Sequence, residues 1–595
     1  MSTAQTREQD SDTELCIADR REESRFAPPA PEIHHGSEPR GRWRIATGIF
    51  LLVLSVYVLT SPGRIDIIDG QTRFDVAYNW IVNGRPVIRD PWIGPHMGVV
   101  GRDGLRYSFY GAPGSVFALP LVWLGIQTGG PDIQPSQFLF SLTSSIFGAG
   151  IASLLFFFYL ELGVTTRKAL IWTLVSSFAT YVWPISNSTF DNAQHAFFAL
   201  AALYFGFLSA RRRSPAYAAL GGLMAGVLFL YQEYFLLIVP ALAISTLTFT
   251  GADDSSASRS PRQQDSRVGR VIATAKRAFQ AATAILRGAW NGLGDARSSG
   301  ARYCAFIAAT GVGVFLSLAY NDYRFGSWFD NGKVSQVVHS AVPFFGNPIA
   351  GLLTVLVSPG KSVFLYSPAL ILGVIGVRQW WRRKPELFVA VAASSLILVG
   401  FISCITFAGG DWCWGPRYLT LLLPLWALGF PFVVGVNVRR ELAVAVIAVG
   451  FLVQAMALSV ENQRFFFERG LNDYFWAEDS WTYFKRSALF ARPEEVASLS
   501  QGVPPTARLF NSIPIPDWST YTILGPPVNL PRRLTPLWIR DYKIYFLARP
   551  WPLWMWWLPP SIRPVNILAW LTALSSVALA GIGLIYQGLQ RRGNA

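Results

Sequence analysis

Long apolar stretches alternate with short polar segments along this sequence, and several of the polar segments are basic. Most of the apolar stretches hold about 18–22 residues, which is the length that an α-helix needs to cross the hydrocarbon core of a bilayer. The pattern predicts an all-α integral membrane protein with about twelve transmembrane helices. The predicted spans cover residues 45–60, 137–162, 169–186, 192–210, 216–230, 235–249, 303–320, 362–380, 387–407, 418–436, 442–458 and 565–586.

One further apolar stretch, residues 115–126, holds only about a dozen residues and is short for a span. If it does not cross, every cluster of Lys and Arg beside the spans falls on one side, which the positive-inside rule identifies as the cytoplasm. If it crosses, most of these clusters are reversed. We therefore predict an interfacial or re-entrant helix here, with both chain ends inside the cell.

Residues 65–85, between the first span and this stretch, are too polar to cross a membrane. Apolar side chains recur there with the i, i+3, i+4, i+7 spacing of an amphipathic helix, which we predict over residues 71–82. Asp69 precedes this helix, and Gly84 with Pro86 ends it. The apolar repeat is formed by Phe74, Ala77, Tyr78 and Ile81.

The composition agrees with a membrane protein. Of the 595 residues, 51% are hydrophobic and only 15% are charged, against about 25% charged in soluble domains. The net charge is +15, but the basic residues lie beside apolar spans and therefore indicate cytoplasmic loops rather than nucleic-acid binding. The four cysteines match no zinc pattern and no disulfide framework, although Cys404 and Cys413 could lie on the same side and pair.

The predicted organisation has a central membrane module with polar segments around it. Residues 1–44 are predicted to be a disordered cytoplasmic tail. The transmembrane module covers residues 45–460 and contains a basic cytoplasmic loop at 251–301, whose amphipathic part suits a surface helix attracted to anionic lipid. Residues 461–564 form an extracytoplasmic loop rich in Pro and aromatic residues, and residues 565–595 hold the last span and a cytoplasmic tail.

Ionisable residues are almost absent from the predicted spans and gather in the outer loops. Ion-coupled transporters tend instead to carry such residues near the bilayer midplane. The arrangement favours an enzyme at the membrane surface, and the chemistry that suits it is transfer from a lipid-linked phosphate donor. Such a site needs a base for the acceptor hydroxyl and cations for the leaving phosphate.

Asp69 is the candidate base, and its alternative role is an N-cap of the predicted helix. Lys361 and Arg417 each head a predicted span at the outer surface, where a snorkelling lysine and a plain interfacial anchor are the alternative interpretations. Trp412 is a candidate for stacking on a sugar, or a member of the aromatic belt. Asp191 and His195, one helical turn apart, are interpreted as a hydrogen-bonded pair, because two residues do not make a metal site.

The order of these pieces resembles the GT-C superfamily of membrane glycosyltransferases, which use polyprenyl-phosphate sugars and include the protein O-mannosyltransferases and the lipid A aminoarabinose transferases. Their first outer loop carries the pattern D-[DE]-x-x-Y-x-x-x-A-x-x-L-x-x-G, and the matching stretch here is IIDGQTRFDVAYNWIVNG. The resemblance implies that Asp69 is the catalytic aspartate. Gly70 stands at the neighbouring acidic position and Ala77 at the alanine position, while Phe74 and Gly84 each come one residue late.

Further pieces follow in the family's order over roughly residues 45–460. The resemblance implies that Lys361 and Arg417 hold the donor phosphate, and Asp191, Arg324 and Trp412 are further substrate-binding candidates. The pieces are YSFYGAPGSVFALPLVWLG, STFDNAQHAFFALAALYF, YNDYRFGSWFDNG, SPGKSVFLYSP and GGDWCWGPRYLTLLLPL.

We therefore predict transfer of a sugar from a polyprenyl-phosphate carrier to an acceptor on the extracytoplasmic face, with inversion at the sugar. The predicted location is the bacterial inner (plasma) membrane, with the active site facing outside. No metal site and no cofactor are predicted. A transporter or flippase of a lipid-linked saccharide is the first alternative, and a non-catalytic membrane scaffold is the second.

Overall fold

The structure, a computed structural model, describes residues 39–89, 97–130, 133–247, 296–333, 344–410, 413–436, 438–460, 462, 465, 487–500 and 563–590. The predictions for residues 1–38, for 251–295 and for most of 461–564 lie outside these residues. Within them the chain is helical, apart from one two-stranded antiparallel hairpin and an isolated bridge between Phe345 and Ile405.

The elements follow one another in a regular order along the chain. They are α2 (Pro39–Thr60), α3 (Ile68–Asn83), β1 (Gly98–Val100), β2 (Arg106–Ser108), α5 (Pro113–Val116), α6 (Leu119–Gly129), α7 (Gln134–Ser141), α8 (Thr143–Glu161), α9 (Thr166–Phe178), α10 (Val182–Ser186), α11 (Asn192–Arg212), α12 (Pro215–Tyr231), η1 (Glu233–Ile238), α13 (Val239–Ala243), η2 (Ile244–Thr246), α15 (Ala296–Phe325), α17 (Pro348–Leu356), α18 (Val363–Tyr366), α19 (Leu370–Arg383), α20 (Pro385–Ser403), η5 (Arg417–Leu419), α21 (Leu422–Ala427), η6 (Phe430–Gly435), α22 (Arg440–Ser459), α25 (Ala488–Ser500) and α29 (Arg563–Gln590).

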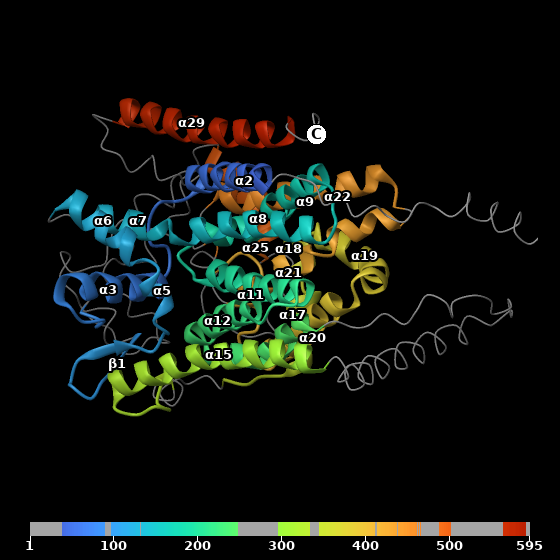
Figure 1. Cartoon of the computed structure of the whole chain (residues 1–595). Helices are drawn as coiled ribbons and strands as arrows, with labels where there is room; N and C mark the ends of the chain where they lie inside the picture. The colour runs from blue at the N-terminus through green and yellow to red at the C-terminus, as the bar shows by residue number, and fades with distance from the viewer. Residues whose placement is uncertain are drawn as a thin grey trace, which may run out of the picture.

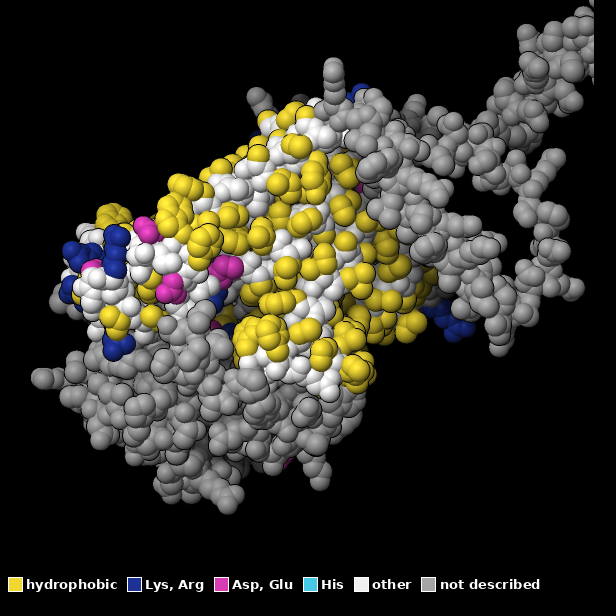
Figure 2. Space-filling view, turned by 90° about the horizontal axis from the view of Figure 1, so that it is seen from below, with side chains coloured by type: hydrophobic (Ala, Val, Ile, Leu, Met, Phe, Trp, Pro, Cys, Tyr) yellow, Lys and Arg dark blue, Asp and Glu magenta, His cyan; other side chains and the backbone are white. Residues whose placement is uncertain are grey.

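The long helices form a stack that runs from α29 and α2 at one edge to α15 at the other (Figure 1). α3, α6, α7 and β1 lie together at one end of this stack. Figure 2 shows hydrophobic side chains over most of the described surface of one face, with charged side chains gathered towards its ends. An apolar surface of this extent suits lipid rather than water as the surrounding medium. On α15, for example, Val312, Phe315 and Leu316 are about half exposed (48%, 58% and 50%).

Among the residues that the structure describes, seven helices are long and apolar enough to cross a membrane, so the chain is a multi-pass membrane protein. They coincide with seven of the twelve predicted spans. The other five predicted spans are helical but shorter or interrupted. That each of them crosses the membrane stays a prediction. Proline lacks the amide donor that a continuous helix needs, and it lies within or beside the segments α9–α10, η1–α13–η2, α18–α19 and η5–α21–η6. The seven candidate spans are Gly41–Thr60, Gln134–Glu161, Asn192–Arg212, Ser299–Phe325, Pro385–Ser403, Arg440–Ser459 and Ile567–Gln590.

The short apolar stretch at 115–126 folds as the end of α5 and most of α6. α6 has 11 residues, which at about 1.5 Å per residue is roughly half of the bilayer core. Its length therefore agrees with a helix that does not cross. α7 packs closely against α6, and Gly125 allows this packing, because a Cβ there would lie 2.3 Å from the Cα of Ser136.

The first and last spans, α2 and α29, pack against each other through glycines. A Cβ at Gly48 would lie 2.5 Å from the carbonyl oxygen of Gly581, and a Cβ at Gly581 would lie 2.7 Å from the carbonyl oxygen of Gly48. Small residues let two membrane helices approach closely, and dispersion contacts then hold them. The C-terminal span is therefore joined to the module through its first helix.

The helix α3 matches the amphipathic helix predicted over 71–82 and extends it at its N-terminal end to Ile68. Gly84 ends it with φ of 68°, a left-handed conformation that favours glycine, as the sequence predicted. Phe74 and Ala77 are buried, and Tyr78 and Ile81 pack against the same cluster. The N-cap position belongs to Ile67, and no side chain caps the helix there. The alternative role of Asp69 as an N-cap is therefore wrong.

Candidate active site

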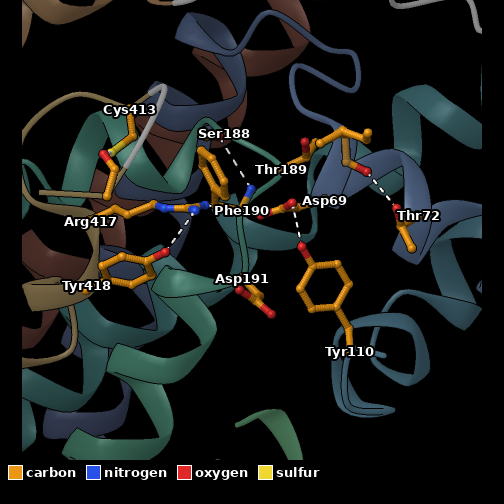
Figure 3. A network of polar contacts seen from close by, with 12 residues as sticks. Asp69, Thr72, Tyr110, Ser188, Thr189, Phe190, Asp191, Cys413, Arg417 and Tyr418 are labelled. Carbon is orange, nitrogen blue, oxygen red and sulfur yellow. Dashed lines mark hydrogen bonds and ion pairs between the residues drawn. The ribbon is translucent and has the colours of Figure 1, made fainter. Parts of the chain in front are cut away.

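The carboxylate of Asp69, in the first turn of α3, is contacted by two residues that lie far away in the sequence. The Tyr110 hydroxyl donates a hydrogen bond of 2.6 Å to Oδ1, and Arg417 Nη1 lies 3.1 Å from Oδ2. Figure 3 shows Asp69 between these two side chains. The side chains of Asp69 and Arg417 are 14% and 12% exposed. The carboxylate is therefore mostly shielded from water but still accessible to a ligand, which suits a general base.

Tyr110 acts as a hydrogen-bond donor to this carboxylate. Burial raises the pKa of Tyr110 well above its ordinary value, and the negative charge of Asp69 raises it further. The hydroxyl therefore keeps its proton at neutral pH and orients Oδ1 of Asp69.

The backbone around Tyr110 is held by Arg324, from the last turn of α15. Arg324 is only 2% exposed. Its Nη1 donates to the carbonyl oxygens of Ser108 and, at 3.2 Å, of Tyr110. Its Nη2 donates to Asn321 Oδ1 at 2.7 Å. Arg324 was expected to bind substrate, and in this structure its contacts position the segment that carries Tyr110.

Arg417 begins η5 and rests on aromatic side chains. Its guanidinium carbon lies 4.0 Å from the ring centroid of Phe190, and Nη2 donates to the Tyr418 hydroxyl at 3.2 Å. A cation over an aromatic face gains electrostatic energy that grows as water is excluded. Gly410 makes room for the side chain, because a Cβ there would lie 2.4 Å from Arg417 Cγ. These contacts orient the guanidinium towards the carboxylate of Asp69.

Asp66, three residues before Asp69, has a different role. It is 9% exposed and accepts hydrogen bonds from Ser188 Oγ at 2.6 Å and from Thr189 N at 2.8 Å. These hydrogen bonds fix the position of the loop that precedes Phe190. Gly70 packs on the same loop, because a Cβ there would lie 2.2 Å from Thr189 Oγ1. A side chain therefore does not fit at position 70, where the pattern that this stretch resembles has an acidic residue.

Asp191 follows this loop at the start of α11 and forms an ion pair with Arg73 of α3, with Oδ2 lying 2.8 Å from Nη2. His195 Nε2 lies 3.4 Å from the same oxygen, and the His195 ring packs against Tyr231. Burial by itself raises the pKa of Asp191, but the Arg73 guanidinium and then the neighbouring His195 outweigh it and bring the pKa well below its ordinary value. Asp191 is therefore ionised and serves as the partner of Arg73.

Lys361 lies behind the site rather than at its opening. It is 4% exposed, and its ammonium group donates to three backbone carbonyl oxygens, those of Gly410 at 2.8 Å, Cys413 at 2.9 Å and Gly415 at 3.2 Å. An ammonium group has three donors, so these carbonyls match all of them. The snorkelling alternative is wrong, because the group is buried. Its predicted role as a phosphate ligand stays a prediction, and the observed role is to shape the loop before Arg417.

The helix α25, which lies within the segment 461–564, packs against the other side of this loop. Arg492 is 0% exposed, and its guanidinium carbon lies 5.3 Å from the ring centroid of Trp414. Its Nη1 also donates to the Val460 carbonyl at 2.8 Å. Ser487 Oγ, just before α25, donates to the Pro359 carbonyl at 2.7 Å. This segment therefore supports the loops that carry Lys361 and Arg417.

Trp412 and the neighbouring Asp411 lie outside the described residues. Within the described ranges, no group of three or more His, Cys, Asp or Glu side chains is close enough to hold a metal ion. Cys404 and Cys413 are free thiols, so the possible disulfide between them is not formed.

The structure brings together Asp69, Arg417 and, through Arg73, Asp191. The sequence alone does not identify Tyr110, Arg73, Phe190 or Tyr418 as site residues. One signal was available, because Arg73 lies four residues after Asp69 and therefore on the same face of a helix. No comparable spacing links Tyr110, Phe190 or Tyr418 to Asp69.

No known protein family and no curated protein matches this sequence. Among solved structures, the chain is similar to ArnT from Cupriavidus metallidurans. In the form bound to undecaprenyl phosphate, the identity is 12%, the match covers 78% of this chain and 80% of that chain, and the TM-score is 0.38. In the apo state the identity is also 12%, the coverage is 76% and 77%, and the TM-score is 0.40.

The oligosaccharyltransferase of Archaeoglobus fulgidus in its apo form is similar at 14% identity, with 82% of this chain and 61% of that chain covered and a TM-score of 0.36. Both kinds of protein are GT-C membrane glycosyltransferases, the class that the sequence motifs resemble. TM-scores at this level describe only a distant similarity in how the helices are arranged. The functional assignment below therefore rests on the residues of this chain.

Proposed function

We propose that this protein transfers a sugar from a polyprenyl-phosphate carrier to an acceptor hydroxyl at the membrane surface. The observation that carries the proposal is the partly exposed Asp69 carboxylate, which is oriented by Tyr110 and paired with the cation Arg417. It joins a candidate base and a candidate phosphate ligand in one site, at the end of a membrane-spanning helical stack (Figure 1).

In the proposed reaction, Asp69 removes the proton of the acceptor hydroxyl as its oxygen attacks the anomeric carbon of the donor sugar. The bond between this carbon and the phosphate oxygen breaks, and its electron pair leaves with polyprenyl phosphate. A single displacement of this kind inverts the anomeric centre. Arg417 neutralises the charge that develops on the phosphate, where a guanidinium offers two parallel donors.

The ion pair between Asp69 and Arg417 gives the donor a second effect. A phosphate that binds Arg417 competes with Asp69 for the same guanidinium. The carboxylate is then released towards the acceptor hydroxyl, with the hydrogen bond from Tyr110 still in place. Donor binding thereby prepares the base for the acceptor.

The surroundings of the proposed reaction follow from the distribution of charge. We place the site on the extracytoplasmic side, because the basic clusters then lie in the cytoplasm. The setting that fits is a bacterial inner membrane with an acceptor in the cell envelope.

The test is transfer from a panel of polyprenyl-phosphate sugars by purified wild-type protein, measured as release of polyprenyl phosphate. Asp69→Asn should abolish release while the protein still folds. Asp75→Asn is the matched control on the same helix, because Asp75 accepts its hydrogen bonds from Asn79 and from the backbone of Arg89.

Release by wild type and by Asp75→Asn, but not by Asp69→Asn, supports the proposal. Full activity of the Asp69→Asn variant contradicts the proposed role of Asp69 as the base. Movement of labelled lipid-linked saccharide across vesicles without release of polyprenyl phosphate favours a flippase.

A further inference from the structure

Arg73 is a buried cation that lies next to the proposed catalytic pair. It follows Asp69 by one turn of α3, and its side chain is 4% exposed. Its guanidinium carbon lies 4.4 Å from the ring centroid of Tyr110, whose hydroxyl contacts Asp69. Tyr110 therefore touches Arg73 with its ring and the carboxylate of the base with its hydroxyl.

The position of Arg73 is set by two close contacts with the segment at α5. Ser115 Oγ donates to the Arg73 carbonyl at 2.9 Å. Gly114 leaves space for the side chain, because a Cβ there would lie 2.7 Å from Arg73 Cδ. The guanidinium is therefore held in place rather than free to turn into solvent.

Only part of the hydrogen-bonding capacity of Arg73 is used. Nη2 pairs with Asp191 at 2.8 Å. Nε and Nη1 are buried, and no described residue offers either of them a hydrogen-bond acceptor. A guanidinium carries five N–H donors in a rigid plane, and buried donors in native proteins normally have partners. Nε and Nη1 lie on opposite sides of the guanidinium, so each of them is available to an acceptor oxygen of its own.

The other cations near the site are more fully engaged. The ammonium of Lys361 is matched by three carbonyl oxygens. Arg417 contacts Asp69 with one terminal nitrogen and the Tyr418 hydroxyl with the other. Arg73 is therefore better suited than Lys361 to be the second cation beside Arg417.

We propose that Arg73 binds the phosphate of the polyprenyl-phosphate donor together with Arg417, using Nη1, while Asp191 holds the guanidinium through Nη2. This inference rests on the proposed function and names the second phosphate ligand of that site. The phosphodiester of the donor and the phosphomonoester released by transfer both carry acceptor oxygens for two guanidinium groups, and two such groups hold a phosphate more tightly than one.

The test is equilibrium binding of undecaprenyl phosphate to the purified protein in detergent, with undecaprenol and inorganic phosphate as separate probes. Arg73→Gln combined with Asp191→Asn removes both charges and leaves no buried carboxylate without a partner. We expect this double variant to bind undecaprenyl phosphate at least ten-fold more weakly, with unchanged affinity for undecaprenol. Arg89→Gln on an exposed arginine is the matched control and should bind as wild type does.

Asp191→Asn alone separates a ligand from a purely structural ion pair. If Arg73 binds the phosphate, this variant should keep or increase the affinity, because a competing negative charge is removed and Nη2 is released. If the ion pair matters only for the fold, Asp191→Asn should weaken binding as much as the double variant does, and this result overturns the proposal. Melting temperatures of every variant, measured with and without lipid, identify any variant that does not fold.

Three further outcomes have defined meanings. Loss of binding in Arg417→Gln but not in the double variant overturns the role of Arg73 and leaves the proposed function standing. No binding of undecaprenyl phosphate by wild type overturns both. Equal competition by inorganic phosphate and by the lipid phosphate shows that the phosphate group alone is recognised, which supports the two-cation site.

Discussion

Asp69 and Arg417 are 348 residues apart in the sequence, yet Nη1 of the arginine lies 3.1 Å from Oδ2 of the aspartate. One comes from an amphipathic helix in the first polar segment, and the other from the turn that follows Pro416. The pair places the proposed base and the proposed phosphate-binding cation in direct contact. Their joint chemistry leads to the following predictions.

Arg417→Gln should lower the rate of sugar transfer by about 10²–10³-fold, the usual effect of removing one donor that stabilises developing negative charge. Arg417→Lys should recover part of this loss, because it keeps the charge but not the two parallel donors. The measurement is release of polyprenyl phosphate under saturating donor. Arg106→Gln, on the exposed side of the β-hairpin, should retain full activity. A fully active Arg417→Gln variant contradicts the role of this residue.

Tyr110→Phe should lower kcat by roughly ten-fold, because it removes one hydrogen bond to Asp69 worth about 1–1.5 kcal/mol. The ring that packs on Arg73 is kept, so the affinity for the donor phosphate should change little. Steady-state kinetics over a range of donor concentrations separate the two effects. Tyr217→Phe, whose hydroxyl contacts Arg212 away from the site, is the control. An equal loss in both variants argues against a specific role of Tyr110.

The ion pair between Arg73 and Asp191 should make stability depend on acidity. The pKa of Asp191 is lowered in the folded protein, while an unfolded aspartate titrates near about 3.9. The pair therefore stabilises the fold fully above about pH 5, and this contribution shrinks as the pH falls below about 4, by about 1 kcal/mol per pH unit. Melting temperatures of wild type and Asp191→Asn should converge on acidification. A difference that does not change with pH contradicts this prediction.

Gly48→Leu should destabilise the contact between α2 and α29, because a side chain at this position meets the backbone of Gly581. Overpacking of this kind typically costs about 1–3 kcal/mol. The loss should appear as a lower melting temperature in detergent. Gly583→Leu is the matched control on α29, since a Cβ there meets no atom within 4 Å. Equal destabilisation by both variants shows that the glycine contact is not the cause.

The sequence by itself determined the elements that depend on local pattern. Apolar stretches of bilayer length identified the seven long helices, because a spanning backbone must satisfy its hydrogen bonds internally. The amphipathic repeat and Gly84 located α3 and its end. The place of Asp69 at the start of this helix, with the resemblance to the GT-C pattern, predicts it as the base. Each of these features is a property of neighbouring residues, which a single sequence displays directly.

The tertiary structure alone decided which polar residues meet. Asp66 and Asp69 are three residues apart and both carry a carboxylate. Asp66 accepts hydrogen bonds from Ser188 and Thr189, whereas Asp69 contacts Tyr110 and Arg417. Lys361 heads an apolar helix as a surface lysine does, yet its ammonium is buried among the carbonyl oxygens of a loop about fifty residues later. The physical reason is that the partner of a buried charge is set by how distant helices pack, and residue type and spacing along one segment do not encode that packing.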